Sequence, residues 1–263
     1  MKINRKKILL GFFCIAILAA ITYAIVRGQS QVQDTFTDET KIASKTNITI
    51  TGGQIRLFNC GDNVTFTYKS SQVTFGTVTS TNSVCWLDRN LGANQIATKA
   101  TDTAAYGDYF QWGREDDGHQ ASTSATVEGD MTLTAQPGHS NFIKEQTSPY
   151  DWATTTWTTR WTVAASDPCP AGWRVPTNAE WSSEEATFSP QSLVGAYASP
   201  LKLTAGGYRS RTNGSLLDVG TYGHYWSSVV SGTSAWDLSF YSSDSYMGSS
   251  YRAYGFSVRC LKD

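Results

Sequence analysis

Residues 235–260 read AWDLSFYSSDSYMGSSYRAYGFSVRC, and this stretch decides the fold of the C-terminal part of the chain. Apolar and polar side chains alternate along its first part: Trp236, Leu238 and Phe240 against Asp237, Ser239 and Tyr241. Because successive side chains of a strand point to opposite faces, this order predicts a strand that buries the first set and displays the second. Phe256, Val258 and Cys260 alternate with Ser257 and Arg259, which predicts a final strand of the same kind.

The composition of the 263-residue chain is that of a turn-rich domain containing strands. Charged residues make up only 16%, whereas there are 13 tyrosines and 9 tryptophans. The formal net charge of −1 provides no basic footprint, so we expect no nucleic-acid partner.

The N-terminus predicts export and membrane attachment. A basic tail, residues 1–7, precedes an uncharged segment from Ile8 to Val26 that is long enough to span a bilayer. The positive charges place the tail in the cytoplasm and the rest of the chain outside, as in a single-pass protein of the cell membrane with an extracellular C-terminal domain. A cleaved signal peptide is the alternative, but AIVRGQS at positions 24–30 is a poor cleavage site. Residues 27–45 lack periodicity and are interpreted as a stalk.

Cysteine usage agrees with export. Beyond Cys14 in the apolar segment there are four cysteines: Cys60, Cys85, Cys169 and Cys260. None has C-x-x-C spacing, which favours disulfides over a metal site. Of the three possible connectivities we expect Cys60–Cys85 and Cys169–Cys260.

Periodicity predicts one α+β domain over residues 46–263. Alternating patterns at 47–53, 63–71 and 72–80 indicate antiparallel strands joined by short turns. Ala105, Tyr109 and Trp112 recur at helical spacing after a possible N-cap at Asp102 or Thr103, which predicts a first helix. A second helix follows the capping box of Thr177 and Glu180, with Trp181 pointing inward. The loop over 116–161 shows no clear pattern.

Four ordered motifs support a resemblance to a known family. CWLDRNLGA at 85–93, GDYFQWGR at 107–114, DPCPAGWRVPTNAEW at 167–181 and the pair YWSS and GFSVRC resemble the FISUMP-type major paralogous domain of bacterial surface proteins. The resemblance implies a C-type-lectin-like fold of the formylglycine-generating-enzyme-like branch, with two helices and antiparallel strands. It covers nearly all of residues 46–263, but a fold does not define a function.

The C-terminal part also resembles the variable region of proteins diversified by retroelements. In that family Asn codons of a template become other codons ending in C or T, which never encode Lys, Glu, Gln, Met or Trp. Between Leu203 and Cys260 there is no Lys, Glu or Gln, so Met247 and the tryptophans are expected to be scaffold. All suspected variable positions are reachable from an Asn codon, and Leu217 is one of them. The others are the predicted ligand-binding residues: Ser210, Asp218, Tyr222, His224, Asp237, Ser239, Tyr241, Asp244, Tyr246, Gly248, Ser249, Ser250, Tyr251 and Tyr254.

The function expected from these features is recognition without chemistry. Tyrosines supply rigid amphipathic contact area, and Ser, Gly and Asp supply adaptable hydrogen bonds, as in an antibody paratope. We expect a membrane-anchored receptor or adhesin that is not an enzyme, needs no cofactor or metal, and binds an unidentified extracellular protein or cell-surface ligand through about residues 210–254.

Several alternatives remain open on the sequence. The first is a FISUMP-type surface domain of structural or adhesive role whose C-terminal stretch is fixed. The second is that the Tyr- and Ser-rich stretch is an ordinary solvated loop, which has the same composition. The third is a formylglycine-generating-type oxidase, which would need reactive cysteines that bridges would consume.

Other polar groups are given ordinary structural roles. His119 and His139 are expected at the surface, and the acidic turn at 115–117 lacks the spacing of a calcium loop. The tryptophans of the four motifs are expected in the core.

Sequencing the gene with its flanking DNA tests the diversification hypothesis. We expect a near-copy of the segment encoding Ser210–Cys260 that differs only where the copy has adenine, next to a reverse-transcriptase gene. The absence of any copy from the genome, or suspect codons that end in A or G, would eliminate diversification.

Overall fold

The computed structural model describes residues 48–51, 54–129, 131–161 and 166–263, which fall into two units. In the first unit, Met1–Asn59, strand β1 (Ile48–Thr51) pairs antiparallel with β2 (Gln54–Leu57). The predicted cytoplasmic tail, transmembrane segment and stalk lie outside the described residues. Within the described residues, no helix has both the length and the apolar character that a bilayer crossing requires.

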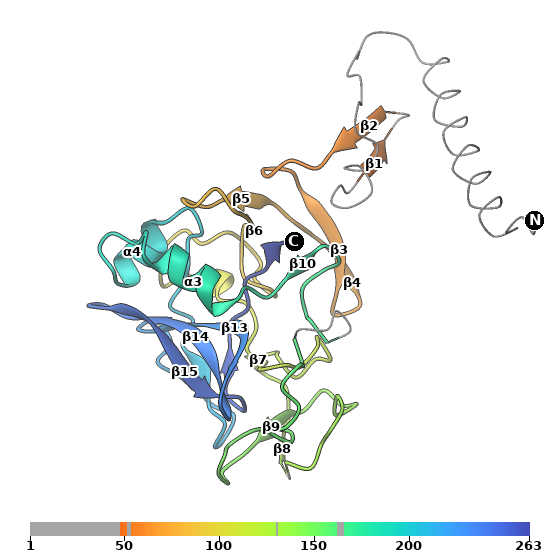
Figure 1. The fold of residues 1–263 in the computed structure, drawn as a ribbon, viewed down its shortest axis with the longest axis vertical. Coiled ribbons are helices and arrows are strands. Elements are labelled where there is room, and N and C mark those ends of the chain that lie inside the picture. The colour runs from red at the N-terminus through yellow and green to blue at the C-terminus, as the bar shows by residue number, and fades with distance from the viewer. Residues whose placement is uncertain (1–47, 52–53, 130, 162–165) are drawn as a thin grey trace, which may run out of the picture. The chain divides into compact units, whose positions relative to one another are not determined.

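The second unit, Cys60–Asp263, is built from short sheets (Figure 1). A three-stranded antiparallel sheet has β14 (Ser234–Phe240) between β13 (Gly223–Ser231) and β15 (Ser245–Tyr251). One four-stranded sheet has the order β10 (Trp173–Arg174), β17 (Leu261–Lys262), β6 (Cys85–Leu87) and β5 (Thr77–Thr79). The other has the order β12 (Leu216–Leu217), β11 (Tyr208–Arg209), β16 (Gly255–Phe256) and β7 (Phe110–Gln111). Strand β3 (Val64–Tyr68) pairs with β4 (Ser71–Phe75), and β8 (Thr126–Glu128) runs parallel to β9 (Phe142–Lys144).

The predicted α+β class is wrong, because the described chain is rich in β-structure. Only two short α-helices occur among the described residues, α3 (Asn178–Glu185) and α4 (Leu193–Ala198). The helix expected after Asp102 stops after one 3-10 turn, η1 (Thr103–Ala105), although Asp102 does cap it by accepting a hydrogen bond from the Ala104 amide. Gly107 then adopts a φ of 75°, and the following residues join a sheet as β7. The helical spacing of Ala105, Tyr109 and Trp112 therefore predicted a helix where the chain forms a short turn and a strand.

Helix α3 begins as predicted. The Thr177 side chain accepts a hydrogen bond from the Glu180 amide, and the Glu180 carboxylate accepts one from the Thr177 amide at 2.7 Å. This capping box satisfies amides that the first turn of a helix leaves unpaired. Trp181 on the buried side is fully covered, as expected.

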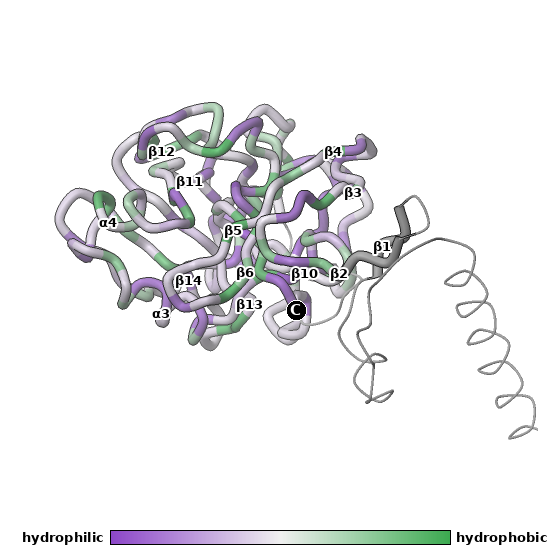
Figure 2. Tube along the Cα trace, turned by 90° about the horizontal axis from the view of Figure 1, so that it is seen from above, coloured by the Kyte–Doolittle hydropathy of each residue, from purple (hydrophilic) through white to green (hydrophobic). Residues whose placement is uncertain are grey.

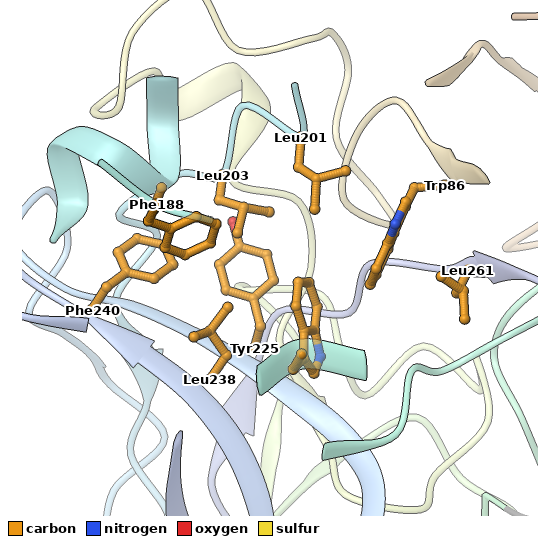
Figure 3. Packing of buried hydrophobic residues seen from close by; sticks show 10 residues of the cluster. Trp86, Phe188, Leu201, Leu203, Tyr225, Leu238, Phe240 and Leu261 are labelled. Atoms are coloured by element: carbon orange, nitrogen blue, oxygen red, sulfur yellow. The ribbon is translucent and has the colours of Figure 1, made fainter. Parts of the chain in front are cut away.

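A hydrophobic core lies between α3 and one face of the β13–β14–β15 sheet (Figure 3). Tyr225, Leu238 and Phe240 contribute from the sheet. Trp181 packs against Trp86 with a ring-centroid distance of 4.8 Å, which connects the sheet's core to β6. Each buried aromatic side chain contributes about 2–3 kcal/mol through removal from water.

The two predicted disulfides are present. Cys60 is bonded to Cys85, and Cys169 to Cys260. The second bridge spans 91 residues of the chain and therefore closes a loop that contains β11 to β16.

The described part of this unit buries five arginines, which donate hydrogen bonds to groups that helices and strands do not pair. Arg114, Arg160, Arg209, Arg252 and Arg259 are each at most 2% exposed. Figure 2 shows short hydrophilic and hydrophobic stretches alternating along the tube. A guanidinium has five donors, so one buried arginine can satisfy several carbonyl groups of irregular chain.

Two of these arginines share one buried carboxylate. Asp151 accepts from Arg160 at 2.7 Å and from Arg252 at 3.1 Å, and all three side chains are fully buried. Arg252 also donates to the carbonyls of Gly232 and Ser234, at the turn between β13 and β14. The cluster therefore attaches the segment around Asp151 to the three-stranded sheet.

Removing the shared charge should destabilise the fold strongly. We expect Asp151→Asn to lower the free energy of unfolding by about 3–5 kcal/mol, because two guanidinium groups would remain buried without a counter-charge. Urea unfolding of the disulfide-intact chain measures the change.

The matched control is Glu128→Gln. It breaks the surface pair with Lys144, in which the Glu128 side chain is 68% exposed, and should change stability by less than about 1 kcal/mol. Equal effects of the two substitutions would contradict the proposed role of Asp151.

Candidate ligand-binding surface

The strand register gives the β13–β14–β15 sheet a second face opposite the core. His224, Ser239 and Tyr246 lie directly across the three strands from one another. Asp237 lies one step further along the sheet, opposite Gly248 of β15. Since Leu238 and Phe240 alternate with these residues and fill the core, this second face carries Asp237 and Ser239 together with His224 and Tyr246.

Aromatic rings continue from this face over neighbouring segments without interruption. Tyr241 stacks on Tyr222 at 5.0 Å, and Tyr222 lies 5.9 Å from the parallel ring of His224. His224 stacks on Phe256 at 4.8 Å, and Phe256 lies 5.9 Å from Tyr254. These ring-centroid distances are those of favourable aromatic pairs.

The array ends at a cation. Tyr254 lies 6.2 Å from Tyr251, whose ring packs edge-on against Tyr150 at 4.6 Å. The Arg211 guanidinium lies over all three rings, 3.9 Å from the centroid of Tyr150. We call the whole set the aromatic surface; it comprises Tyr150, Tyr208, Arg211, Tyr222, His224, Tyr241, Tyr246, Tyr251, Tyr254 and Phe256.

A hydrogen-bonded polar network lies in the sheet beside these rings. The Ser239 hydroxyl donates to Oδ2 of Asp237 at 2.6 Å, and Nδ1 of His224 lies 2.8 Å from the same hydroxyl oxygen. Oδ1 of Asp237 and Nε2 of His224 are buried, and neither has a hydrogen-bond partner. Burial lowers the pKa of His224 to about 4 and raises the pKa of Asp237 to about 6.

The expected display of Asp237 and Ser239 is wrong. Asp237 is 1% exposed and Ser239 is 2% exposed, while Trp236 on the core side is only half-buried. The alternation of faces is as predicted, but aromatic neighbours from β13, β15 and β16 cover the polar face. The edge strand β15 occupies a stretch for which the sequence analysis predicted no strand.

The other predicted residues differ in exposure. Asp218, Asp244, Tyr246, Ser249 and Tyr251 are exposed, and so is Leu217. Tyr222, His224, Tyr241, Gly248, Ser250 and Tyr254 are half-buried, and Ser210 is buried. Six of the predicted residues belong to the aromatic surface, whereas Ser249 points to the same side as Trp236 and the core.

Four members of the aromatic surface were missed by the sequence analysis: Tyr150, Tyr208, Arg211 and Phe256. Phe256 was assigned to the inward-facing side of a strand. Tyr208 and Arg211 lie two residues and one residue from the predicted Ser210, and no sequence pattern singles them out. Tyr150 comes from the loop that the sequence could not place, and no sequence signal connects it to Tyr251.

The predictions for the motif tryptophans and for His119 have opposite outcomes. The motif tryptophans Trp86, Trp112, Trp173 and Trp226 are buried, as predicted. His119 was expected at the surface but is fully buried, with Nδ1 2.6 Å from Oδ1 of Asp117, and burial lowers its pKa to about 3. Within the described ranges, no group of three or more His, Cys, Asp or Glu residues could hold a metal ion.

A hollow of about 350 Å³ lies elsewhere in the unit. Trp86, Glu180 and Leu261 are among the residues that line it, between α3 and the sheet of β6 and β17. None of the predicted ligand-binding residues lines this hollow.

Comparison with known proteins gives one match. A family described as a domain of unknown function, DUF8237, matches residues 200–261, which include β11 to β16 and most of the aromatic surface. No curated protein and no solved structure matches the chain.

The raised pKa of Asp237 should appear in the pH dependence of stability. The folded pKa of about 6 exceeds the ordinary value of 3.8, so the folded state binds the extra proton between these values and loses stability as the pH rises. Asp237→Asn removes this loss. We expect the variant to match the wild type near pH 4 and to be more stable by about 3 kcal/mol at pH 7.

Urea unfolding of both proteins from pH 4 to pH 7 measures the difference. His224, whose folded pKa is lowered, contributes in the opposite direction in both proteins, so the comparison isolates Asp237. A difference that does not change with pH would contradict the burial of this carboxyl group.

Proposed function

We propose that this chain is an outward-facing binding protein, held at the membrane by the apolar segment at residues 8–26, that recognises an extracellular protein or cell-surface ligand through the aromatic surface. We further propose that it is a variable protein diversified by a retroelement. The observation that carries the proposal is the continuous array of rings from Tyr241 to Tyr150, which passes through His224 on the face of the sheet opposite the core.

The physics of tyrosine supports binding at this surface. Tyr246 and Tyr251 are 41% and 37% exposed, so each offers apolar area and a hydroxyl group to a partner. Their rings have few rotatable bonds, and little conformational entropy is lost when a partner orders them. The aromatic contacts between Tyr251, Tyr254 and Tyr150 preorganise this end of the surface.

The network of His224, Ser239 and Asp237 supports binding rather than hydrolysis. A nucleophilic serine needs a histidine base that is itself oriented by the carboxylate. Here the serine lies between the other two groups, donates its hydrogen bond to Asp237 and is buried. An oxidase of the formylglycine-generating type is disfavoured too, since Cys60, Cys85, Cys169 and Cys260 all form disulfides.

A non-diversified surface domain is the second candidate, and the burial of Asp237 and Ser239 favours it. Buried hydrogen-bonded positions tolerate substitution less well than exposed ones. This candidate keeps ligand binding by the aromatic surface, with a fixed sequence.

Truncation of three tyrosines tests the binding surface. We expect the triple variant Tyr246→Ala, Tyr251→Ala and Tyr254→Ala to lose at least about 100-fold in affinity, because interfaces depend on a few aromatic anchors. The ligands are peptides selected on the wild-type full-length chain from a random library, and the affinity is measured by biolayer interferometry.

The matched control removes apolar side chains that are equally exposed but lie elsewhere. Ile96→Ala with Val194→Ala truncates residues that are 45% and 60% exposed, and should retain affinity. The melting temperature of each variant is measured in parallel. Peptides that bind the triple variant as tightly as the wild type would refute the proposed surface.

A further inference from the structure

We infer that the aromatic surface binds a cationic hydrogen-bond donor at Asp237, namely an arginine or lysine side chain of a protein partner. The inference rests on the proposed function and adds the chemistry of the ligand. It follows from a count of protons in the network of His224, Ser239 and Asp237, together with the charges and rings around it.

The hydroxyl proton of Ser239 determines the roles of its neighbours. A carboxylate can only accept, so at a separation of 2.6 Å Ser239 donates its single proton to Oδ2 of Asp237. Its oxygen is then the acceptor for the 2.8 Å bond with His224, which places the imidazole proton on Nδ1. Nε2 of the neutral His224 consequently carries a lone pair and no proton.

Both open positions of the network are therefore acceptors. Nε2 of His224 and Oδ1 of Asp237 are buried without a partner. Leaving a buried polar atom unpaired costs about 1–3 kcal/mol, and more where the group is charged. A ligand that supplies donors would remove this cost, whereas a ligand that supplies acceptors would not.

The charge at Asp237 favours a cationic donor over a neutral one. Among the described residues no lysine, arginine or histidine forms an ion pair with Asp237, although this side chain is 1% exposed. A charge-assisted hydrogen bond is about twice as strong as a neutral one. A carboxylate without a counter-charge is thus the strongest feature that this end of the surface presents.

Aromatic rings beside the network suit a cation as well. The stacked rings of Tyr222 and Tyr241 continue from His224, and their faces attract positive charge. The Arg211 guanidinium already occupies the corresponding position over Tyr150, Tyr251 and Tyr254 at the other end of the array. Its charge disfavours a second cation there, so the cation-binding position is confined to the Asp237 end.

The Tyr246 ring lies beside this position. A methyl group at Gly248 would lie 3.3 Å from the Tyr246 ring and 3.4 Å from the Asp237 carboxylate, so the ring and the carboxylate flank the same glycine. Gly248 leaves β15 without a side chain directly opposite Asp237, Ser250 of β15 lies beside this carboxyl group, and Tyr246 is 41% exposed. Rotation of this ring is the least demanding way to open Oδ1 to a ligand.

A pair of small probes tests the inference on the full-length chain in detergent. N-acetyl-arginine methylamide carries a guanidinium, and the citrulline analogue is a neutral group of the same shape. Their dissociation constants are measured by ligand-observed NMR at pH 7.5. We expect the arginine probe to bind at least about tenfold more tightly. Asp237→Asn should abolish this preference, because the amide keeps the acceptor for Ser239 but loses the charge.

The control Glu128→Gln removes the same charge from an exposed position outside the surface and should keep the preference. Lower pH provides a second readout that needs no substitution. The groups facing Asp237 are Ser239, Ser250, His224 and Tyr246 with the neighbouring Tyr222 and Tyr241. Of these, His224 stays neutral down to about pH 4. The preference should therefore fall as the pH drops through about 6 and Asp237 is protonated.

Equal binding of the two probes, no binding of either, or a preference that survives in Asp237→Asn would overturn the inference. The library peptides separate this failure from a failure of the proposed function. Peptides that need the three tyrosines but carry no arginine or lysine would leave the binding surface standing without its cation position. Peptides that need neither the tyrosines nor Asp237 would refute both.

Discussion

Buried guanidinium groups are the interaction on which the rest of this structure depends. The described chain has few residues in helices, and long connections must satisfy their carbonyl groups inside the protein. Arg209 donates to carbonyl groups of His119, Ala121 and Ser124, and Arg259 donates to those of Leu87 and Leu201. The guanidinium donors therefore pair buried carbonyl groups in this unit that a helix or a β-sheet would pair in other proteins.

This arrangement separates the scaffold from the surface. Arg252 holds the β13–β14 turn through Gly232 and Ser234, and Asp151 connects it to Arg160. The core side of the sheet is closed by Trp181 and Phe188. The opposite side can then carry rings whose outer edges do not contribute to the core. The network at Asp237 is the exception, because it is both buried and incompletely paired.

The sequence predicted those parts of the fold whose signals are local. The capping box at Thr177, the alternation through Leu238 and both disulfides are correct. The first two depend on short spacing, whereas the cysteine count gave the number of bridges and left three connectivities open. The helix after Asp102 failed because Gly107 ended it, and the burial of Asp237 failed because alternation identifies a face but not what covers it. Tyr150 joined the surface through contacts about 100 residues apart in the chain, such as that with Tyr251, and no local pattern encodes them.

The bridge between Cys169 and Cys260 has a consequence for the evolution of this protein. Its covalent loop encloses all the residues predicted to bind ligand, so its restriction of the unfolded chain is the same whatever side chains occupy those positions. For a loop of this length the chain-entropy contribution is about 4.6 kcal/mol. Typical destabilising substitutions cost about 1 kcal/mol each. The bridge thus gives the enclosed segment a margin of mutational robustness, within which new sequences can be sampled before the native state is lost.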